Sequence, residues 1–150
     1  MQEECIINNA ASIVHSEDLS IFAIISSSLH TCWVRAIAGK LGESFRYTSA
    51  TCFNTFPIPK LTQKNKSDLY KSAENILLTR ELYFPRTISE IYDPDAMPAE
   101  LKAVHDLNDE ILERIYIGRK FKNNSERLEN LFNLYSNLSM KKAKYSNLPI

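Results

Sequence analysis

The sequence predicts an α+β protein that is mainly α, with a small strand-helix-strand lobe followed by a C-terminal helical bundle. Before residue 60, short extended segments lie on both sides of an apolar helical segment. After it, the apolar spacing is that of amphipathic helices. Pro57 and Pro59 stand at the junction, where they end a strand because proline cannot donate ladder hydrogen bonds. We therefore expect two domains, residues 1–59 and 60–150.

The first lobe should begin with a strand over residues 5–14, which are small and partly β-branched. A helix over residues 18–38 should follow, because Asp18 supplies a capping side chain and negative charge where a helix begins. Gly39 and Gly42 should end it, since glycine adopts the positive φ angles of a helix end.

Helix 18–38 is apolar around most of its circumference, apart from a narrow polar stripe. Such a helix is normally buried on most sides. If its neighbours were missing it would expose an apolar patch, and we then expect a homodimer through this helix. Its core candidates are Phe22, Ile25, Leu29, Trp33 and Ile37.

A second strand is expected over residues 44–55, where bulky side chains alternate with polar ones. Residues 56–59 should then form a rigid extended connector. The second lobe should hold helices over residues 65–82, 98–117 and 125–141 and a short helical turn at 87–92. Inward-facing candidates in these helices are Leu69, Ala73, Ile76, Leu77, Arg80, Leu101, Val104, His105, Asn108, Ile111, Leu112, Ile115, Leu128, Leu131, Phe132, Tyr135 and Leu138.

Composition is that of an ordinary globular protein, with 44% hydrophobic and 24% charged residues. The sequence has neither a long uninterrupted apolar run nor the basic start and apolar core of a secretion signal, so we expect a cytoplasmic protein without a membrane partner. The three cysteines, Cys5, Cys32 and Cys52, are widely spaced and form no Cys-x-x-Cys pair. We expect them to be small buried residues rather than metal ligands or disulfides.

Charge is distributed unevenly although the net charge is zero. Residues 1–59 carry a net charge of −2, residues 60–87 carry +3, residues 88–118 carry −6 and residues 119–150 carry +5. A nucleic-acid binder that acts alone usually has a strong basic excess, which this chain lacks. The acidic segment should either pack against its basic neighbours or face another part of a larger protein.

Several segments resemble, in order and spacing, the C-terminal part of large MmeI-like adenine DNA methyltransferases, some of which are fused to a restriction nuclease. The resemblance covers nearly the whole chain. Its pieces in the first lobe are residues 24–30 (IISSSLH), 33–36 (WVRA), 39–41 (GKL) and 53–59 (FNTFPIP). Its pieces in the second lobe are residues 91–94 (IYDP), Met97-Pro98 with Leu101, 104–109 (VHDLND), 115–118 (IYIG), 126–128 (ERL) and 131–135 (LFNLY).

The resemblance implies that residues 1–59 are the end of a target-recognition domain and that residues 60–150 are the helical C-terminal domain. The family transfers a methyl group from S-adenosylmethionine to adenine, which requires a Pro-Pro motif that holds the flipped base. This chain has no Pro-Pro pair and only three glycines, too few for a glycine-bearing cofactor turn. We therefore expect no catalytic, cofactor-binding or metal residue here, and a role as a C-terminal fragment whose partners are double-stranded DNA and the methyltransferase core.

Candidate DNA-binding residues all lie in the first lobe: Arg35, Lys40, Arg46, Ser49 and Asn54. Arginine can bind guanine edges with two hydrogen bonds, and lysine or arginine can hold phosphates. A surface charge, or a pair with Glu43, is the alternative for the three basic residues. Capping and turn bonds are the alternative for Ser49 and Asn54.

Two histidines, His30 and His105, are candidates for chemistry. His30, beside Trp33, is expected to be a structural residue with satisfied hydrogen bonds, and His105 is expected to bond within the helical packing rather than to act as a base. Two functions therefore compete: a module that helps to read DNA, and a structural module that docks on the methyltransferase core without contacting DNA. An independent enzyme has no positive support in the sequence.

Overall fold

A computed structural model describes residues 14, 16–41 and 44–146 of the 150-residue chain. The elements are helices α1 (Leu19–Ile25) and α2 (Ser28–Ile37), strands β1 (Gly39–Leu41) and β2 (Ser44–Arg46), a π-helix η1 (Ser49–Phe53), and helices α3 (Gln63–Glu81), α4 (Ile88–Ile91), α5 (Ala99–Ile117) and α6 (Asn124–Ser146). The predicted class, α+β and mainly α, is confirmed.

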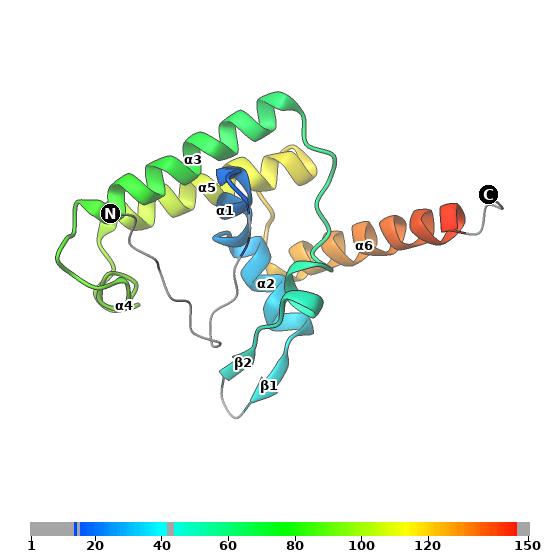
Figure 1. The fold of residues 1–150 in the computed structure, drawn as a ribbon, viewed down its shortest axis with the longest axis horizontal. Coiled ribbons are helices and arrows are strands. Elements are labelled where there is room, and N and C mark those ends of the chain that lie inside the picture. Colours follow the sequence, from blue (N-terminus) through cyan, green and yellow to red (C-terminus); the bar gives the residue numbers. More distant parts are fainter. Residues whose placement is uncertain (1–13, 15, 42–43, 147–150) are drawn as a thin grey trace, which may run out of the picture.

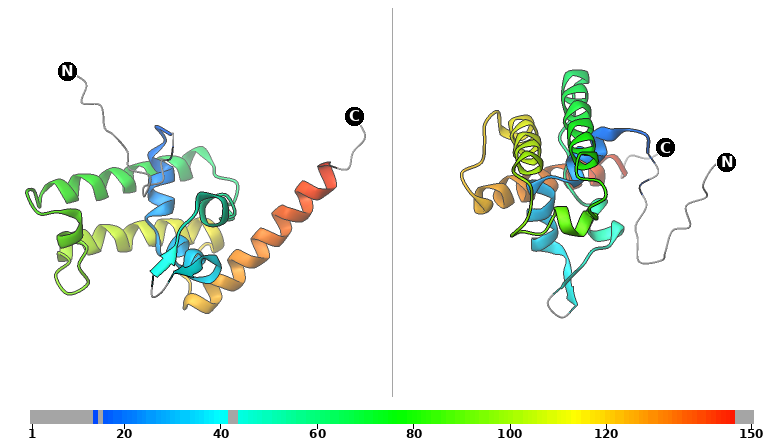
Figure 2. Two further views of the ribbon diagram at one scale, coloured as in Figure 1. Left: turned by 60° about the horizontal axis from the view of Figure 1, so that its bottom comes forward. Right: turned by 90° about the vertical axis from the view of Figure 1, so that its left-hand side faces the viewer.

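Helices α3 and α5 form the centre of the molecule and run side by side in opposite directions (Figure 1). Helix α1 packs on α3, and α2 runs past α5 to the first turns of α6. The hairpin β1–β2 extends from the end of α2, and α6 projects from the body in a different direction (Figure 2). The molecule therefore has a packed centre and two projections.

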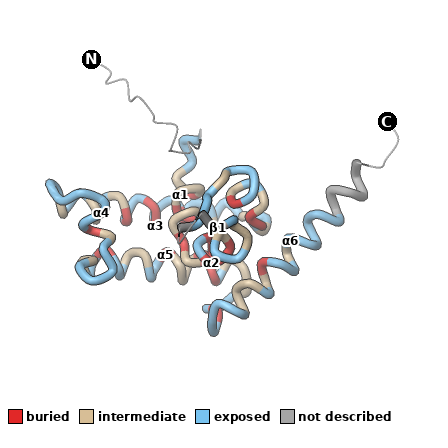
Figure 3. Tube along the Cα trace, turned by 90° about the horizontal axis from the view of Figure 1, so that it is seen from below, coloured by how far each residue is buried: buried red, intermediate tan, exposed pale blue. Residues whose placement is uncertain are grey.

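One core holds residues from both predicted domains, because α1 and α2 pack against α3, α5 and α6. Burial is greatest where these helices meet (Figure 3). The core cluster consists of Ala23, Ile24, Leu29, Trp33, Phe56, Leu69, Ala73, Leu112, Phe121 and Leu131. The proposed boundary at residue 59 stays a prediction from sequence, and the helices on its two sides are packed together.

The predicted single helix 18–38 is wrong, because the chain bends by 58° between α1 and α2. Ser27 has an extended backbone at this bend, and its hydroxyl accepts a hydrogen bond from the amide of His30. The same hydroxyl donates to the carbonyl of Ile24 at 2.6 Å. One serine therefore closes α1 and begins α2. The expected cap at Asp18 is confirmed, since its carboxylate accepts from the amide of Ser20.

The burial of α1 and α2 also changes the expected dimer surface. Ala23, Ile24, Leu29 and Trp33 are covered by the helices around them, so the condition for an exposed apolar patch is not met at these residues, and the homodimer stays a prediction. No single helix in the described part of the chain is both long and apolar enough to cross a membrane, and α1 and α2 meet that criterion only when taken together as a bent pair.

The predicted strand 44–55 is correct only at its beginning. Strand β2 pairs with β1 in an antiparallel ladder, with Gly39 opposite Arg46 and Leu41 opposite Ser44. The chain then turns into η1, where Thr48 caps the π-helix through the amide of Thr51. The predicted strand 5–14 falls outside the described residues except for Val14, which has no regular structure.

The expected positive φ at Gly39 is also wrong. Helix α2 ends because Ala38 is extended, with φ −69° and ψ 138°, and this conformation leads the chain directly into β1. Gly42 lies outside the described residues. Gly118, by contrast, has a left-handed conformation, with φ 77°, and ends α5.

The helices of the second lobe follow the prediction closely. Helix α6 differs, because it continues to Ser146 and not only to residue 141. The side chain of Asn123 accepts the first-turn hydrogen bond from the amide of Glu126. The acidic segment packs against its basic neighbour as expected, since Glu110 pairs with Lys120 at 2.7 Å and Glu113 pairs with Arg127.

Candidate nucleic-acid interface

The five predicted DNA-binding residues lie around the end of α2, the hairpin and η1. Arg35 is in the last turn of α2, and Lys40 and Arg46 are on the two strands that follow it. Ser49 begins η1, and Asn54 ends it. Because η1 packs on α2, all five residues belong to one end of the molecule (Figure 1).

Arg35 and Arg46 are both exposed to solvent. Within the described residues, neither guanidinium has an ion pair or a side-chain hydrogen bond, in contrast to Arg119 and Arg127, which bind Glu126 and Glu113. Glu43, the alternative partner, lies outside the described residues. Within the described residues, both guanidinium groups therefore face solvent without a counter-charge.

Ser49 and Asn54 are also exposed, and they are joined through the backbone: the amide of Asn54 donates to the carbonyl of Ser49 at 2.8 Å, five residues back. The expected capping role belongs to Thr48 instead. Neither the Ser49 hydroxyl nor the Asn54 amide group has a hydrogen bond within the described part of the chain. π-Helices occur frequently at functional sites.

His30 supports the base of the hairpin from inside the core. Its Nε2 lies 3.2 Å from the hydroxyl of Tyr47, the residue after β2, and its ring meets Phe56 edge-on at 4.9 Å. Burial lowers the pKa of His30 to about 4 and raises the pKa of Tyr47, so both side chains are neutral at neutral pH. Within the described structure the Nδ1 atom of His30 has no partner, so this histidine is only half satisfied.

Two further contacts hold the same region in place. The indole Nε1 of Trp33 donates to Thr55 Oγ1 at 3.1 Å, and the hydroxyl of Tyr116 on α5 donates to the carbonyl of Pro57 at 2.7 Å. Tyr47, Thr55 and Tyr116 were not identified from the sequence. The aromatic-rich run 53–59 indicated that this region is packed against other elements. The sequence alone does not reveal which distant helix packs against it.

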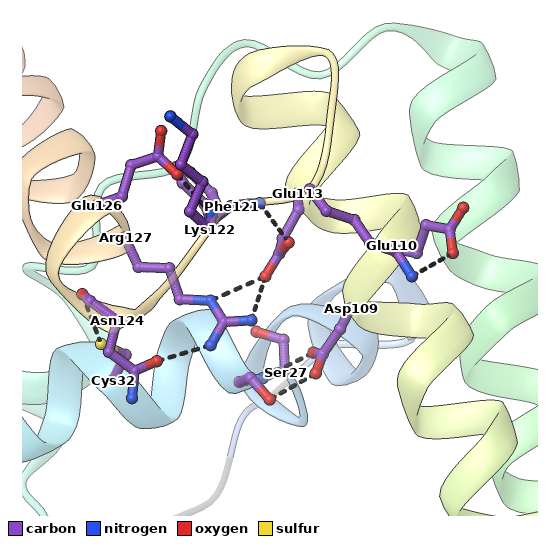
Figure 4. A network of polar contacts seen from close by, with 12 residues as sticks. Ser27, Cys32, Asp109, Glu110, Glu113, Phe121, Lys122, Asn124, Glu126 and Arg127 are labelled. Atoms are coloured by element: carbon purple, nitrogen blue, oxygen red, sulfur yellow. Dashed lines mark hydrogen bonds and ion pairs between the residues drawn. The ribbon is translucent and has the colours of Figure 1, made fainter.

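A polar network fixes the start of α2 against α5 (Figure 4). Asp109 accepts hydrogen bonds from the amide of Ser28, at 2.7 Å, and from its hydroxyl. Asn108, fully buried, donates to the carbonyl of Ala23 at 2.8 Å and accepts from Ser72 at 3.0 Å. Two neighbouring residues of α5 therefore fix the orientation of α2, and with it the position of Arg35 and of the hairpin.

His105 bonds within the helical packing, as predicted. Its Nε2 lies 2.6 Å from the hydroxyl of Tyr92, which also accepts from Arg80 Nε at 2.7 Å. The Arg80 guanidinium lies over the rings of Phe22 and Tyr92, at 5.1 and 4.9 Å. Burial, the largest effect, lowers the pKa of His105, and the positive charge of Arg80 lowers it further.

Cys32 and Cys52 are buried free thiols, as expected for small core residues, and Cys5 lies outside the described part. Among the described residues, no group of three or more His, Cys, Asp and Glu side chains is arranged to hold a metal ion.

The end of α2, the hairpin and η1 together present exposed cationic and amide side chains on a rigid support. Such a surface suits binding to a polyanion.

Residues 1–60 match the family described as "MmeI, target recognition domain", and residues 61–142 match "MmeI, C-terminal domain". The chain belongs to the MmeI family. The predicted resemblance to this family of restriction-modification enzymes is therefore confirmed.

Two relatives of this MmeI-family chain are informative. It is 36% identical over 136 residues to "DNA methyltransferase A" of Bacillus subtilis (strain 168), an alignment that covers 91% of this chain and 15% of the relative. It is 30% identical, with a TM-score of 0.79, to the solved structure of the Type IIL restriction-modification enzyme MmeI in complex with DNA, over 85% of this chain and 17% of that one. The MmeI-family chain thus spans less than a fifth of each relative.

Proposed function

We propose that this chain is a non-catalytic module of a site-specific, adenine-specific DNA methyltransferase of the restriction-modification type, and that it helps to recognise and position the DNA target. Its partners would be double-stranded DNA and the methyltransferase core, in the same or a separate chain. The core would bind S-adenosylmethionine. The likeness to an enzyme solved in complex with DNA supports this proposal.

The observation that carries the proposal is the projecting surface formed by the end of α2, the hairpin and η1. Arg35 and Arg46 are exposed there without an intramolecular partner in the described structure, beside the polar side chains of Ser49 and Asn54. Arginine and amide side chains are the groups that bind phosphates and base edges. A rigid support holds them, because α2 is fixed to α5 through Asp109.

Binding of the full chain to a labelled random-sequence duplex at several salt concentrations tests the proposal. Each phosphate contact contributes about −0.9 to the slope of log affinity against log salt. Arg35→Ala and Arg46→Ala should each weaken binding and make the slope shallower by about one if they hold phosphate. A loss without a change of slope, restricted to certain sequences, would identify a base contact.

Lys71→Ala is the matched control, because it removes one exposed positive charge from α3, outside the proposed surface. It should leave affinity and slope nearly unchanged. Absence of salt-dependent binding by the folded chain, or an equal effect of all three substitutions, would contradict the proposed DNA surface.

A second function, docking on the methyltransferase core without DNA contact, is favoured by one specific observation. The connection between α3 and α4 exposes large apolar side chains: Leu82 is 77% exposed and Phe84 is 87% exposed, with Ile88 nearby in the sequence. Apolar side chains gathered in this way mark protein-protein contacts. The two functions use different parts of the molecule and can coexist (Figure 1).

A further inference from the structure

Gly39, the first residue of β1, has no role in the described structure that requires glycine. Its φ lies outside the left-handed region, in contrast to the φ of Gly118. A Cβ atom added at Gly39 would lie more than 4 Å from every described heavy atom except those of its two chain neighbours. Neither the backbone conformation nor the packing of the described residues therefore excludes a side chain at this position.

Glycine weakens a strand, because it loses more conformational freedom on folding than any other residue. Within strands it marks bulges, tight bends, and places where a ligand or another backbone approaches closely. The described ladder has no bulge, since its residue pairs follow one another without interruption. The turn from α2 into the hairpin is made by the extended backbone of Ala38. Close approach of another molecule is the explanation that remains for Gly39.

Arg46 lies directly opposite Gly39 in the ladder. Residues that pair directly lie on the same face of a hairpin, so the next pair, Lys40 and Phe45, belongs to the other face. Gly39 and Arg46 are both exposed, on a hairpin that extends from the body (Figure 2). One face of the hairpin thus has an arginine without a counter-charge among the described residues, beside backbone that no side chain covers.

The charges around Gly39 indicate what approaches it. Arg35, in the last turn of α2, adds a second exposed guanidinium to the same end of the molecule. Two cations without described partners favour a polymer of phosphates over a single anion. In protein–DNA complexes, most hydrogen bonds go to phosphate and sugar, and cationic side chains and backbone amides donate many of them.

We infer that a phosphate group of double-stranded DNA lies against the backbone at Gly39 and is held by the guanidinium of Arg46, an inference that rests on the proposed DNA-binding function. A guanidinium binds phosphate through two parallel hydrogen bonds, which fix the distance between them. A side chain at position 39 would occupy space next to that phosphate, whereas glycine leaves it open. Gly39 is therefore a positioning residue, which sets how closely the duplex approaches Arg46.

Binding of the full chain to the labelled random-sequence duplex, with Gly39→Ala or Gly39→Val, tests the inference. Affinity should fall in the order glycine, alanine, valine, because the side chain grows in that order. Gly39→Val should weaken binding about as much as Arg46→Ala does. It should also make the slope of log affinity against log salt shallower by about one, because one phosphate contact is lost.

Urea unfolding separates this effect from damage to the hairpin. Alanine and the β-branched valine suit a strand better than glycine does, so both variants should unfold at an equal or higher urea concentration. A variant that is at least as stable but binds DNA more weakly has lost contact with DNA and not its fold. Ala103→Val, on an exposed side of α5, is the matched control for added bulk and should leave the affinity unchanged.

A double variant tests whether Gly39 and Arg46 act on the same phosphate. Gly39→Val combined with Arg46→Ala should bind about as well as Arg46→Ala alone, because the contact is already lost. Gly39→Val combined with Arg35→Ala should instead show the full additional loss of affinity. Equal additional losses in the two backgrounds would contradict the pairing of Gly39 with Arg46.

The outcomes distinguish this inference from the proposed function. A folded wild-type chain that does not bind the duplex would overturn both. Binding that depends on Arg35 and Arg46 but is unchanged in Gly39→Val would overturn the inference alone. The inference also fails if Gly39→Val lowers the urea midpoint, because the fold itself would then require glycine.

Discussion

Glu113 is a buried carboxylate whose partners come from the turn between α5 and α6 and from the first turn of α6. It is 2% exposed and accepts hydrogen bonds from the amide of Phe121, at 2.8 Å, and from the guanidinium of Arg127. Both the charge and the lone pairs of this carboxylate therefore have partners. Its role is to close the α5–α6 turn over Phe121.

Arg127→Ala should cost about 3–5 kcal/mol of unfolding free energy, because it leaves a buried carboxylate without its counter-charge. Urea unfolding measures the loss. Lys102→Ala, which breaks the exposed pair with Asp106, is the control and should cost less than about 1 kcal/mol. Equal losses in the two variants would show that burial of Glu113 has no energetic consequence.

His30 makes stability depend on pH. Burial lowers its pKa to about 4 in the folded protein, whereas a histidine in the unfolded chain titrates near 6.5. Between these values the unfolded chain binds more protons, so the stabilisation is complete above about pH 6.5 and is lost as the pH falls toward 4, by up to about 1.4 kcal/mol per pH unit.

His30→Gln should flatten this part of the stability profile, measured by urea unfolding from neutral to acidic pH. His105, whose pKa burial also lowers, is present in both proteins, so the difference between the two profiles isolates His30. An unchanged slope in the variant would mean that His30 titrates normally in the folded state.

The sequence predicted the role of a residue where that role depends on its neighbours in the chain. It did not predict the role where that depends on a residue far away in the sequence. The cap at Asp18 and the buried thiols of Cys32 and Cys52 follow from residue type and position. Asp109 gave no local signal, because its partner Ser28 is 81 residues away. The role of Arg35 and Arg46 in DNA binding stays a prediction.

At the scale of elements, amphipathic spacing and stop residues predicted α3, α5 and α6, since each is long and has one apolar side. The bend between α1 and α2 was missed although three consecutive serines, Ser26 to Ser28, mark it. An apolar pattern continues through these serines, and the structure shows that the cap by Ser27 and the tertiary bond from Ser28 to Asp109 break the helix there.

Ser27→Ala should remove the cap of α2 and cost about 1 kcal/mol of unfolding free energy. Thermal or urea unfolding provides the measurement. Ser67→Ala, on the exposed side of α3, is the matched control and should have almost no effect. If Ser27→Ala were neutral, the bend would have to be maintained by Asp109 alone.

The segment 48–55 shows where an alternating pattern misled. Threonine and aromatic residues favour a strand locally, but the hydroxyl of Thr55 donates to the carbonyl of Thr51 and accepts from Trp33. The tertiary contact with Trp33 thus prevails over the local preference, as is common for β-branched residues.

At the scale of the whole molecule, the exposure of an apolar side chain shows whether it stabilises the core or forms part of the surface. Phe84→Ala should change the unfolding free energy by less than about 0.5 kcal/mol, because Phe84 is 87% exposed. Phe56→Ala, which truncates a phenylalanine that is 7% exposed, should cost about 3–5 kcal/mol. Urea unfolding compares the two variants.

Phe84→Ala is also tested for association with a methyltransferase polypeptide, provided that urea unfolding shows the variant to be stable. Weaker association would identify the α3–α4 connection as the docking surface. An unaffected association would remove the support that this connection gives to the docking function.

Residues 1–60 and 61–142 share one core, and this restricts recombination between related genes. Exchange of genetic material between relatives at the codon for residue 60 would combine an α2 from one parent with an Asp109 and an Asn108 from another. The carbonyl of Ala23 and the amide of Ser28 would then face whatever side chains the second parent supplies. Recombination should therefore succeed most often when it transmits both segments together.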